Sequence, residues 1–254
     1  MTDRRDVELA FFLSNMLYYP TQIPTVGDCM QKNDRIPDAV VRRLPGYYRN
    51  LRELEAEGVT RLSSRALGER MGLTASQIRQ DINCFGGFGQ QGYGYNVSNL
   101  KRNIGQILGL DAPHHVVIVG AGNIGCAVAE YPSFRNEGFR VEALFDSDPD
   151  RIGKTVQGAP ILAVDTLAEY LKTHPVDILV LSTPSGSAQA VLDIAVRGGV
   201  RAIWNFAPVE LSIPEAMELA NVHLSDSLMA LSFRLHEREV RRQENPTWIQ
   251  DDSQ

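Results

Sequence analysis

The sequence is poor in cysteine: its 254 residues include only three, Cys29, Cys84 and Cys126. They lie far apart and are odd in number, so their spacing predicts neither a disulfide framework nor a zinc site. We expect them to be small, semi-apolar filler residues in a reducing, cytoplasmic setting. No other residues show the spacing of metal ligands, and we expect no bound metal.

Long hydrophobic runs are also missing. The N-terminal run LAFFLSNMLYY, residues 9–19, is too short to span a bilayer and is interrupted by Asn15. Acidic residues at positions 3, 6 and 8 argue against a signal peptide. We therefore expect no membrane segment.

Strong positive charge is missing as well, since the formal net charge is −6. Taken alone, that value argues against a nucleic-acid-binding protein. The charge is uneven, however: residues 35–111 contain 11 Lys and Arg against 7 Asp and Glu, whereas the remainder contains 14 against 24. A basic segment within an acidic chain is typical of a local nucleic-acid-binding surface.

The basic segment has helical periodicity. Apolar residues between positions 40 and 54 recur near the 3.6-residue period, Pro45 should kink or split this helix, and Gly58 can close it. Two shorter helices follow. Ser63 or Ser64 can cap the first, which runs to about Met71, and Thr74 can cap the second, over about 75–85.

This pair predicts a helix-turn-helix, with Gly72 in the turn and the inner faces formed by Ala66, Leu67, Met71, Leu73 and Ile78. The pair alone is equally typical of any small helical domain. The next stretch, GGFGQQGYGYNV at residues 86–97, has the turn chemistry of a β-hairpin tip. A hairpin directly after a recognition helix favours the winged variant of the motif, in which the helix enters the major groove of DNA and the tip contacts the backbone or minor groove.

A second pattern starts at HHVVIVGAGNIGCAVAEYP, residues 114–132, which reads as strand, glycine turn and helix. Gly120 permits the tight turn, Gly122 lets the backbone approach a pyrophosphate, and Gly125 allows close helix–strand packing. The next strand, RVEALFD, ends in Asp146, 21 residues after Gly125, where an acidic residue meets the adenosine ribose. The pattern predicts NAD(H) in preference to NADP(H); the alternative is a Rossmann-like domain that binds no nucleotide.

Further strands are expected at 177–184 and 201–208, with helices near 164–173 and 186–198. Open α/β sheets bind ligands at the carboxyl ends of their strands, so the segments STPSG and NFAP should flank the nicotinamide. The expected cofactor residues are Gly120, Ala121, Gly122, Asn123, Ile124, Gly125, Asp146, Thr183, Pro184, Asn205, Phe206, Ala207 and Pro208.

Signs of catalysis are lacking. No acid–base pair is placed for hydride transfer, no separate substrate domain is evident, and His114, His115 and His174 are expected to be surface residues. We expect a protein that is not an enzyme. A dehydrogenase with a small helical accessory domain is the alternative.

These segments together resemble the Rex family of redox-sensing transcriptional repressors, over about residues 36–238. The resemblance is carried by RLPGYYRNL, GVTRLSS, SQIRQD, FGGFG, GYGYNV, FDSDPDRIG, WNFAP and LSF, in one order along the chain. It implies an α/β protein with an extension of unknown role (1–35), a winged-helix DNA-binding domain (36–111), a Rossmann NAD(H)-binding domain (112–222), a C-terminal helix (223–242) and a tail (243–254).

The resemblance also implies a homodimer that binds double-stranded operator DNA and is released by NADH, while NAD+ competes. In the family the C-terminal helix swaps between subunits. Here its docking face would be Leu224, Leu228, Leu231 and Leu235. The alternative is an amphipathic terminal helix that packs on its own subunit.

By the same resemblance, an Arg, a Tyr and an Asp couple cofactor to DNA. The first two match Arg49 and Tyr131, but the third position holds His223, and Asp226 lies one helical turn further on. A second hypothesis follows: a DNA-binding paralogue that is insensitive to the cofactor or tuned to another ligand.

The DNA face departs from the family too. Arg79 matches a recognition-helix Arg, whereas Gln80 and the tip residues Gln90 and Gln91 stand where basic residues are usual. Fewer phosphate contacts predict weaker binding and a flatter salt dependence. The expected DNA-facing residues are Ser63, Ser64, Ser76, Gln77, Arg79, Gln80, Gln90, Gln91 and Tyr93.

Overall fold

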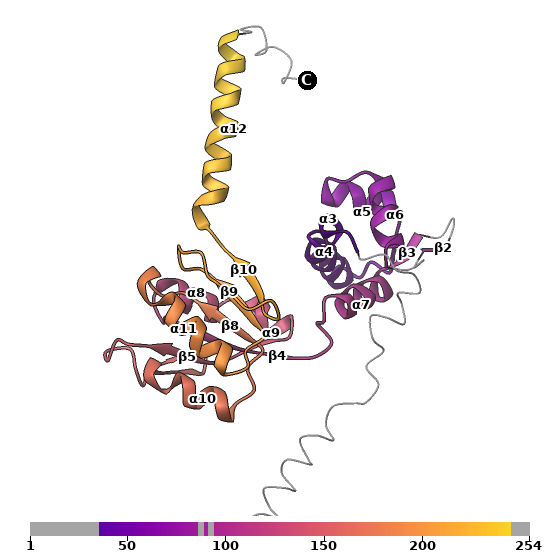
Figure 1. The fold of residues 1–254 in the computed structure, drawn as a ribbon. Helices are drawn as coiled ribbons and strands as arrows, with labels where there is room; N and C mark the ends of the chain where they lie inside the picture. The colour runs from indigo at the N-terminus through magenta and orange to yellow at the C-terminus, as the bar shows by residue number, and fades with distance from the viewer. Residues whose placement is uncertain (1–35, 86–88, 91–93, 245–254) are drawn as a thin grey trace, which may run out of the picture. The chain divides into compact units, whose positions relative to one another are not determined.

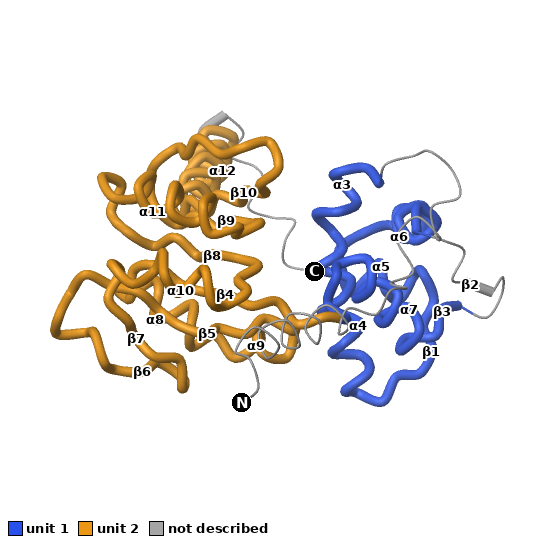
Figure 2. The backbone as a smooth tube through the Cα atoms, turned by 60° about the horizontal axis from the view of Figure 1, so that its bottom comes forward, with its two compact units in different colours: residues 1–111 blue, residues 112–254 orange. Residues whose placement is uncertain are grey.

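The computed structural model describes residues 36–85, 89–90 and 94–244. The chain divides into two compact units, residues 1–111 and residues 112–254 (Figure 2). The predicted extension at 1–35, most of the wing tip and the end of the tail lie outside the described residues.

Unit 1 begins with two helices that meet near Pro45. α3 spans Asp38–Val41 and α4 spans Leu44–Ala56, with Pro45 in the first turn of α4. Proline is tolerated there because the first amides of a helix have no intrahelical partner, so it splits the predicted helix into two. Gly58 follows the C-cap with a φ of 78°, as the sequence predicts.

The helix-turn-helix consists of α5 (Ser64–Met71) and α6 (Ala75–Asn83). The Ser63 hydroxyl accepts from the Ala66 amide at 3.1 Å, and the Thr74 hydroxyl accepts from the Gln77 amide at 3.1 Å. Gly72 makes the turn with a φ of 67°. α6 ends two residues earlier than predicted, at Asn83.

A small antiparallel sheet completes the winged helix (Figure 1). Its strands are β1 (Arg61–Leu62), β2 (Gly89–Gln90) and β3 (Gly94–Asn96), in the order β1-β3-β2. α7 (Val97–Ile107) follows, capped by Asn96, and packs against α4. The core of unit 1 gathers Leu44, Leu51, Leu67, Ile78, Ile82, Leu100 and Ile104. Ala66 was wrongly predicted to face this core: it is exposed, because the apolar stripe of α5 runs through Leu67.

Unit 2 is a doubly wound α/β domain. Its sheet has seven strands among the described residues, in the order β10-β9-β8-β4-β5-β7-β6, and only the β6–β7 pairing is antiparallel. The strands are β4 (His114–Val119), β5 (Phe139–Asp146), β6 (Thr155–Val156), β7 (Ala159–Ala163), β8 (Ile178–Leu181), β9 (Ala202–Asn205) and β10 (Glu218–Asn221). The helices are α8 (Asn123–Ala129), α9 (Pro132–Asn136), α10 (Leu167–Thr173, after a 3-10 turn at Val164–Thr166), α11 (Ser185–Arg197) and α12 (Leu224–Glu244).

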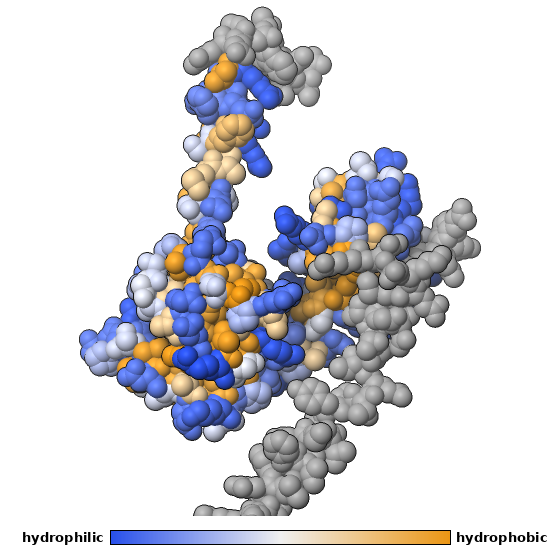
Figure 3. All heavy atoms as spheres, in the orientation of Figure 1, coloured by the Kyte–Doolittle hydropathy of each residue, from blue (hydrophilic) through white to orange (hydrophobic). Residues whose placement is uncertain are grey.

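The two faces of this sheet are covered unequally. On one face, α10 and α11 pack over β4, β5, β8 and β9 around Val117, Phe145, Leu179 and Leu192. On the other, α8 packs over Ile118 and Leu144. No helix connects β9 to β10, and an apolar hollow of about 290 Å³, lined by Ile178, Val180, Ala202, Trp204 and Ala220 among others, is left on that second face. Hydrophobic residues, orange in Figure 3, are visible on the surface of unit 2.

Candidate ligand site and nucleic-acid interface

The three glycines after β4 meet three different demands. Gly120 has a φ of 101°, and a Cβ there would lie 2.4 Å from the Ser182 carbonyl oxygen. A Cβ at Gly125 would lie 1.9 Å from the Gly120 carbonyl oxygen, so α8 sits directly against the turn. A Cβ at Gly122 would meet nothing within 4 Å. Gly120 and Gly125 are therefore required by the protein's own packing, whereas the absence of a side chain at Gly122 leaves open space beside the loop.

Asp146 ends β5 beside this loop and is tied to it. Its Oδ2 accepts from the Ala121 amide at 2.7 Å, and its Oδ1 accepts from the Asp148 amide at 2.9 Å. Arg151 donates to the Ala121 carbonyl and, through Nε, to Asp148 at 3.1 Å. Hydrogen bonds from the Asp150 amide and Arg151 hold the pKa of Asp148 below its ordinary value. The loop is thus fixed by an acidic cluster with one guanidinium across it.

A cavity of about 350 Å³ opens between this loop and the loop after β8. Five predicted residues line it: Gly120, Gly122, Asp146, Thr183 and Pro184. The Thr183 hydroxyl is buried without a hydrogen-bond partner, which is rare unless a ligand or water completes it. Ser182 of the predicted STPSG segment lines it too, as do residues that the sequence reasoning did not place here, among them Ser147, Asp148, Arg151 and Ser187.

Ser182 is held in place rather than free: its hydroxyl donates to the Gly120 carbonyl at 2.8 Å. It joins the two strand ends that form the cavity. Ser182 is the first residue of the predicted STPSG segment, and adjacency to that segment was the signal that would have found Ser187.

The loop after β9 is held by hydrogen bonds of its own. Asn205 is fully buried; its Nδ2 donates to the Val209 carbonyl and to the Asn221 side chain, and its Oδ1 accepts from the Ala207 amide at 2.9 Å. Its side chain therefore holds the shape of the loop, because its amide nitrogen and oxygen are both hydrogen-bonded within unit 2. Ala207 is buried and Phe206 packs against Trp204. None of residues 205–208 lines the cavity.

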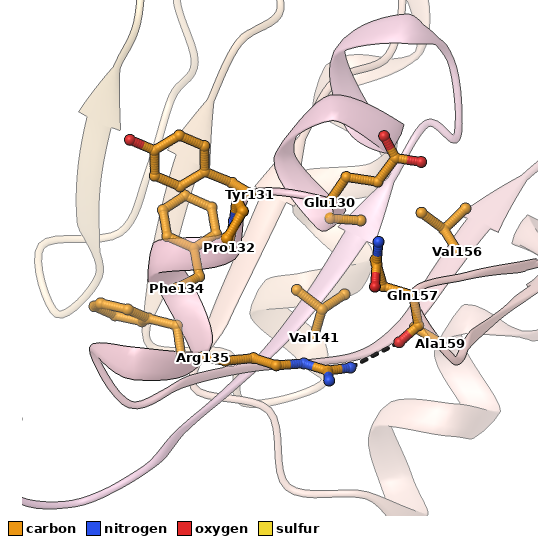
Figure 4. A pocket seen from close by; sticks show the side chains of 11 residues that line it. Glu130, Tyr131, Pro132, Phe134, Arg135, Val141, Val156, Gln157 and Ala159 are labelled. Carbon is orange, nitrogen blue, oxygen red and sulfur yellow. Dashed lines mark hydrogen bonds between the residues drawn. The ribbon is translucent and has the colours of Figure 1, made fainter.

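Tyr131 lies at a second hollow, of about 230 Å³, between α8, α9 and β5. Its ring is 54% exposed and sits beside Phe134, with ring centroids 4.9 Å apart (Figure 4). The Arg135 guanidinium crosses to the Gln157 carbonyl at 2.7 Å. Arg49 is exposed on α4 of unit 1, His223 is half-buried at the start of α12, and Asp226 is exposed. The four predicted coupling residues are therefore divided between the units, one in unit 1 and three in unit 2.

The exposed face of α6 presents polar side chains. Ser76, Arg79, Gln80 and Asn83 are exposed, and Gln77 is half-buried. Arg79 donates to the Ser64 hydroxyl at 3.1 Å, so α5 supports the guanidinium of α6. Gln90 lies in β2, whereas Gln91 and Tyr93 lie outside the described residues.

A buried carboxylate, which the sequence reasoning missed, lies behind this face. Asp81 of α6 is 1% exposed. It accepts from Arg43 Nε and Nη2 at 2.7 and 2.8 Å, from the Tyr47 hydroxyl at 2.8 Å and from Gln77 Nε2 at 2.9 Å. Burial opposes its ionisation, but these hydrogen bonds outweigh burial and hold the pKa of Asp81 below its ordinary value. The carboxylate fixes α6 to α4.

Other kinds of site are not found in the part of the chain that the structure describes. Residues 36–85, 89–90 and 94–244 contain no group of three or more His, Cys, Asp or Glu that could hold a metal. Within the same ranges no helix is long and apolar enough to cross a membrane.

Known proteins match both units. A family model described as a putative DNA-binding protein N-terminus matches residues 35–83, and one described as a CoA binding domain matches residues 111–209. The chain is 51% identical over 210 residues to the redox-sensing transcriptional repressor Rex of Clostridium beijerinckii, covering 83% of this chain and 100% of that one. A Rex repressor of Thermoanaerobacter pseudethanolicus is 48% identical over 211 residues, covering 83% and 94%.

The chain belongs to the Rex family of redox-sensing transcriptional repressors. Solved structures of RSP, a Rex-family repressor, extend the match across both units. The complex of RSP with β-NAD+ and operator DNA is 46% identical, with a TM-score of 0.77 over 85% of this chain and 100% of that one. The complex of RSP with β-NADH is 44% identical, with a TM-score of 0.75 over 83% and 99%.

Family membership confirms the winged-helix and Rossmann architecture expected from the sequence. The two Rex relatives are matched over 100% and 94% of their own length, so the similarity includes both units. A protein that shared only the Rossmann fold would match over unit 2 alone.

Proposed function

We propose that this Rex-family protein is a transcriptional repressor that binds operator DNA through unit 1 and is released when NADH binds unit 2. The proposal rests on the presence of both sites in one chain. Unit 1 has a winged helix whose recognition helix α6 exposes a polar face. Unit 2 has a glycine loop at residues 120–125, called the glycine cradle below, with open space at Gly122. RSP, solved with NAD+ and operator DNA and with NADH, supports the same pair of ligands. We propose a cytoplasmic regulator and not an enzyme.

The residues of the cradle fit a dinucleotide. The gap beside Gly122 admits a pyrophosphate, the unpartnered Thr183 hydroxyl can donate to a ligand, and Asp146 stands where an adenosine ribose is bound in such folds. Two further carboxylates, Asp148 and Asp150, add negative charge beside Asp146, which disfavours a 2′-phosphate. The proposal is therefore NAD(H) in preference to NADP(H).

A homodimer is supported by the surfaces left uncovered. Every residue of α12 whose burial is described is exposed, including Leu224 at 63%, Leu228 at 66% and Phe233 at 62%. Apolar and charged side chains both reach the surface along it (Figure 3). A solvated helix does not keep large apolar side chains, and unit 2 has an open apolar hollow beside Trp204. We propose that α12 swaps into a second copy of the chain.

The helix is apolar on two sides, which extends the expectation from the sequence. Leu224, Leu228, Leu231 and Leu235 form one stripe, while Met229, Phe233 and Val240 lie on the other side and are also exposed. Insertion between two surfaces of the partner would bury both stripes, whereas docking on one surface would leave the second in water.

The proposed mechanism is a shift between two arrangements of the dimer. A dimeric reader needs its two recognition helices about one DNA turn apart, roughly 34 Å. NADH favours an arrangement with a different spacing, and NAD+ leaves the DNA-competent one populated. The nicotinamide ring carries a positive charge in NAD+ and none in NADH, which is the difference that the site must sense.

His223 favours a second candidate function. An imidazole stands where the family has an Asp, and Asp226 is one helical turn away, its amide bonded to the His223 carbonyl at 3.1 Å. A histidine cannot replace a carboxylate as a partner of arginine. The second candidate is a DNA-binding family member whose operator affinity does not depend on NADH.

One titration separates these functions. The full-length protein is used to select an operator from a randomised duplex pool, and binding is followed by fluorescence anisotropy at fixed salt while NADH or NAD+ is added. Release by NADH that NAD+ opposes supports the first function. An unchanged operator affinity, with NADH binding confirmed by its fluorescence, supports the second. NADPH and coenzyme A serve as controls, since coenzyme A shares the adenosine and pyrophosphate and unit 2 matches a CoA binding domain.

A further inference from the structure

Gln77 and Arg79 border the exposed face of α6 from opposite sides. At about 100° per residue, they lie roughly 160° apart around the helix, with Ser76, Gln80 and Asn83 between them. Each is held by a neighbour: Arg79 by the Ser64 hydroxyl and Gln77 by the Asp81 carboxylate. Residues in the first turns of a recognition helix contact base edges in the major groove.

The bond from Gln77 to Asp81 determines which way the carboxamide points. An ionised carboxylate only accepts hydrogen bonds, so it must face the Gln77 Nε2 group and not Oε1. The 2.9 Å contact uses one of the two Nε2 hydrogens. If that is the hydrogen trans to Oε1, the remaining hydrogen and Oε1 form the side-by-side donor and acceptor pair that matches N7 and N6 of adenine.

Burial and hydrogen bonds hold the Asp81 carboxylate in one position. Asp81 is 1% exposed, and its other three contacts come from Arg43 and Tyr47, at the start of α4. A glutamine in water samples both amide orientations, whereas Gln77 is restricted by a group that the core of unit 1 holds in place. A carboxamide that is already oriented in the free protein distinguishes adenine from the other bases more strongly, without any added contact to DNA.

We propose that Gln77 is a base-reading residue that selects adenine in each operator half-site, and that Asp81 is the positioning residue that orients its carboxamide. This inference rests on the proposed DNA-binding function and adds a specificity determinant to it.

The test is a base-pair scan of the selected operator, measured without cofactor by anisotropy competition. For the wild-type protein one A·T pair in each half-site should be preferred over the other three pairs by roughly tenfold to a hundredfold. Gln77→Met has a side chain of similar length without polar atoms, and it should abolish the preference at that pair alone. Gln106→Met changes an exposed glutamine of α7 that is not among the expected DNA-facing residues, so it is the matched control and should leave that pair's preference intact.

Asp81→Asn tests the positioning role. An asparagine can donate as well as accept, so Gln77 can adopt either amide orientation and the preference at the same pair should fall at least severalfold. Binding to a random duplex is measured alongside, because loss of folding would lower both affinities and positioning alone lowers only the preference. Far-ultraviolet circular dichroism checks that each variant is folded.

The outcomes are distinct. A protein that binds no duplex overturns the DNA-binding function and this inference with it. Specific binding in which Gln77→Met keeps every base preference overturns the inference alone. Loss of the preference in Gln77→Met but not in a folded Asp81→Asn overturns the positioning role of Asp81.

Discussion

Two glycines of unit 2, Gly122 and Gly125, are explained by different causes: one by the packing of the protein and the other by the space that a ligand needs. Gly125 and Gly122 belong to one loop, yet a Cβ at Gly125 would lie 1.9 Å from a backbone oxygen and a Cβ at Gly122 would meet nothing. Gly122 also has a φ of −74°, which any residue adopts. Packing therefore explains the first glycine and leaves the second without a structural reason.

The pair gives a prediction. Gly122→Ala should leave thermal stability nearly unchanged but weaken NADH binding at least tenfold, because the added methyl occupies the space expected for the pyrophosphate. Gly125→Ala should lower the unfolding temperature by several degrees, since α8 must move away from the turn. Differential scanning fluorimetry and NADH fluorescence titration measure the two effects. A Gly122→Ala protein that binds NADH normally would show that the cradle is not where the cofactor binds.

At the scale of elements, a buried charge joins α4 to α6. Asp81 has a lowered pKa, so its interactions stabilise the folded state above about pH 4, the ordinary value for an unfolded Asp. This stabilisation is lost as the pH falls through the lower pKa of the folded state.

Hydrogen exchange in full-length protein tests this assignment. At pH 6 to 7, Asp81→Asn should strongly reduce amide protection in α4 and α6, since it leaves Arg43 without its carboxylate. The difference between wild type and variant should shrink as the pH falls below about 4, where the unfolded chain takes up a proton at Asp81, and should continue to shrink down to the lower pKa of the folded state. A difference that stays constant down to pH 2.5, after correction for intrinsic exchange rates, would contradict a role for the ionised carboxylate.

The C-terminal helix carries another prediction at this scale. Leu228→Glu should convert the dimer to a monomer. Burial of one leucine side chain contributes about 1.5–3 kcal/mol, and each of the two subunits of a swapped dimer would bury its own Leu228. Ser227→Glu adds the same charge to a neighbouring polar position of α12 and should remain dimeric. Multi-angle light scattering after gel filtration gives the mass of each. If Leu228→Glu has the mass of the wild-type dimer, α12 does not hold the subunits together.

Sequence patterns predicted the helices, caps and turns more completely than the side-chain contacts inside each unit. Caps and glycines act locally, so Ser63, Thr74, Gly72 and the split at Pro45 follow from a few neighbouring residues. Asn205 was expected at the ligand because it ends a strand, but only the folded loop shows that its amide is used internally. Asp81 was missed although its position was informative: it lies among Ile78 and Ile82 on the apolar side of α6, where a charge needs a partner from another helix.

At the scale of the whole molecule, the two ligands must influence each other equally. If NADH weakens operator binding by a given factor, saturating operator must weaken NADH binding by the same factor, because both routes around the cycle have the same free-energy change. Coupling between sites in proteins is commonly about 5- to 150-fold. We therefore expect the apparent Kd for NADH to rise by a factor in this range when operator is added, and the factor to match that from the anisotropy titration.

We expect His223 to determine where in this range the coupling factor of the protein lies. The resemblance to the family implies an Asp at this position, and an imidazole offers no negative charge to an arginine, so we expect the coupling factor of the wild-type protein to lie near the lower end. His223→Asp should raise the factor measured in both directions, while Ser227→Glu, which adds a carboxylate elsewhere in the first turn of α12, should not. Two titrations per variant suffice: NADH fluorescence with and without operator, and operator anisotropy with and without NADH. Equal factors that rise together in His223→Asp place residue 223 in the coupling between the two sites; equal factors that do not change in His223→Asp mean that the signal passes through other residues, with Asp226 the next to substitute.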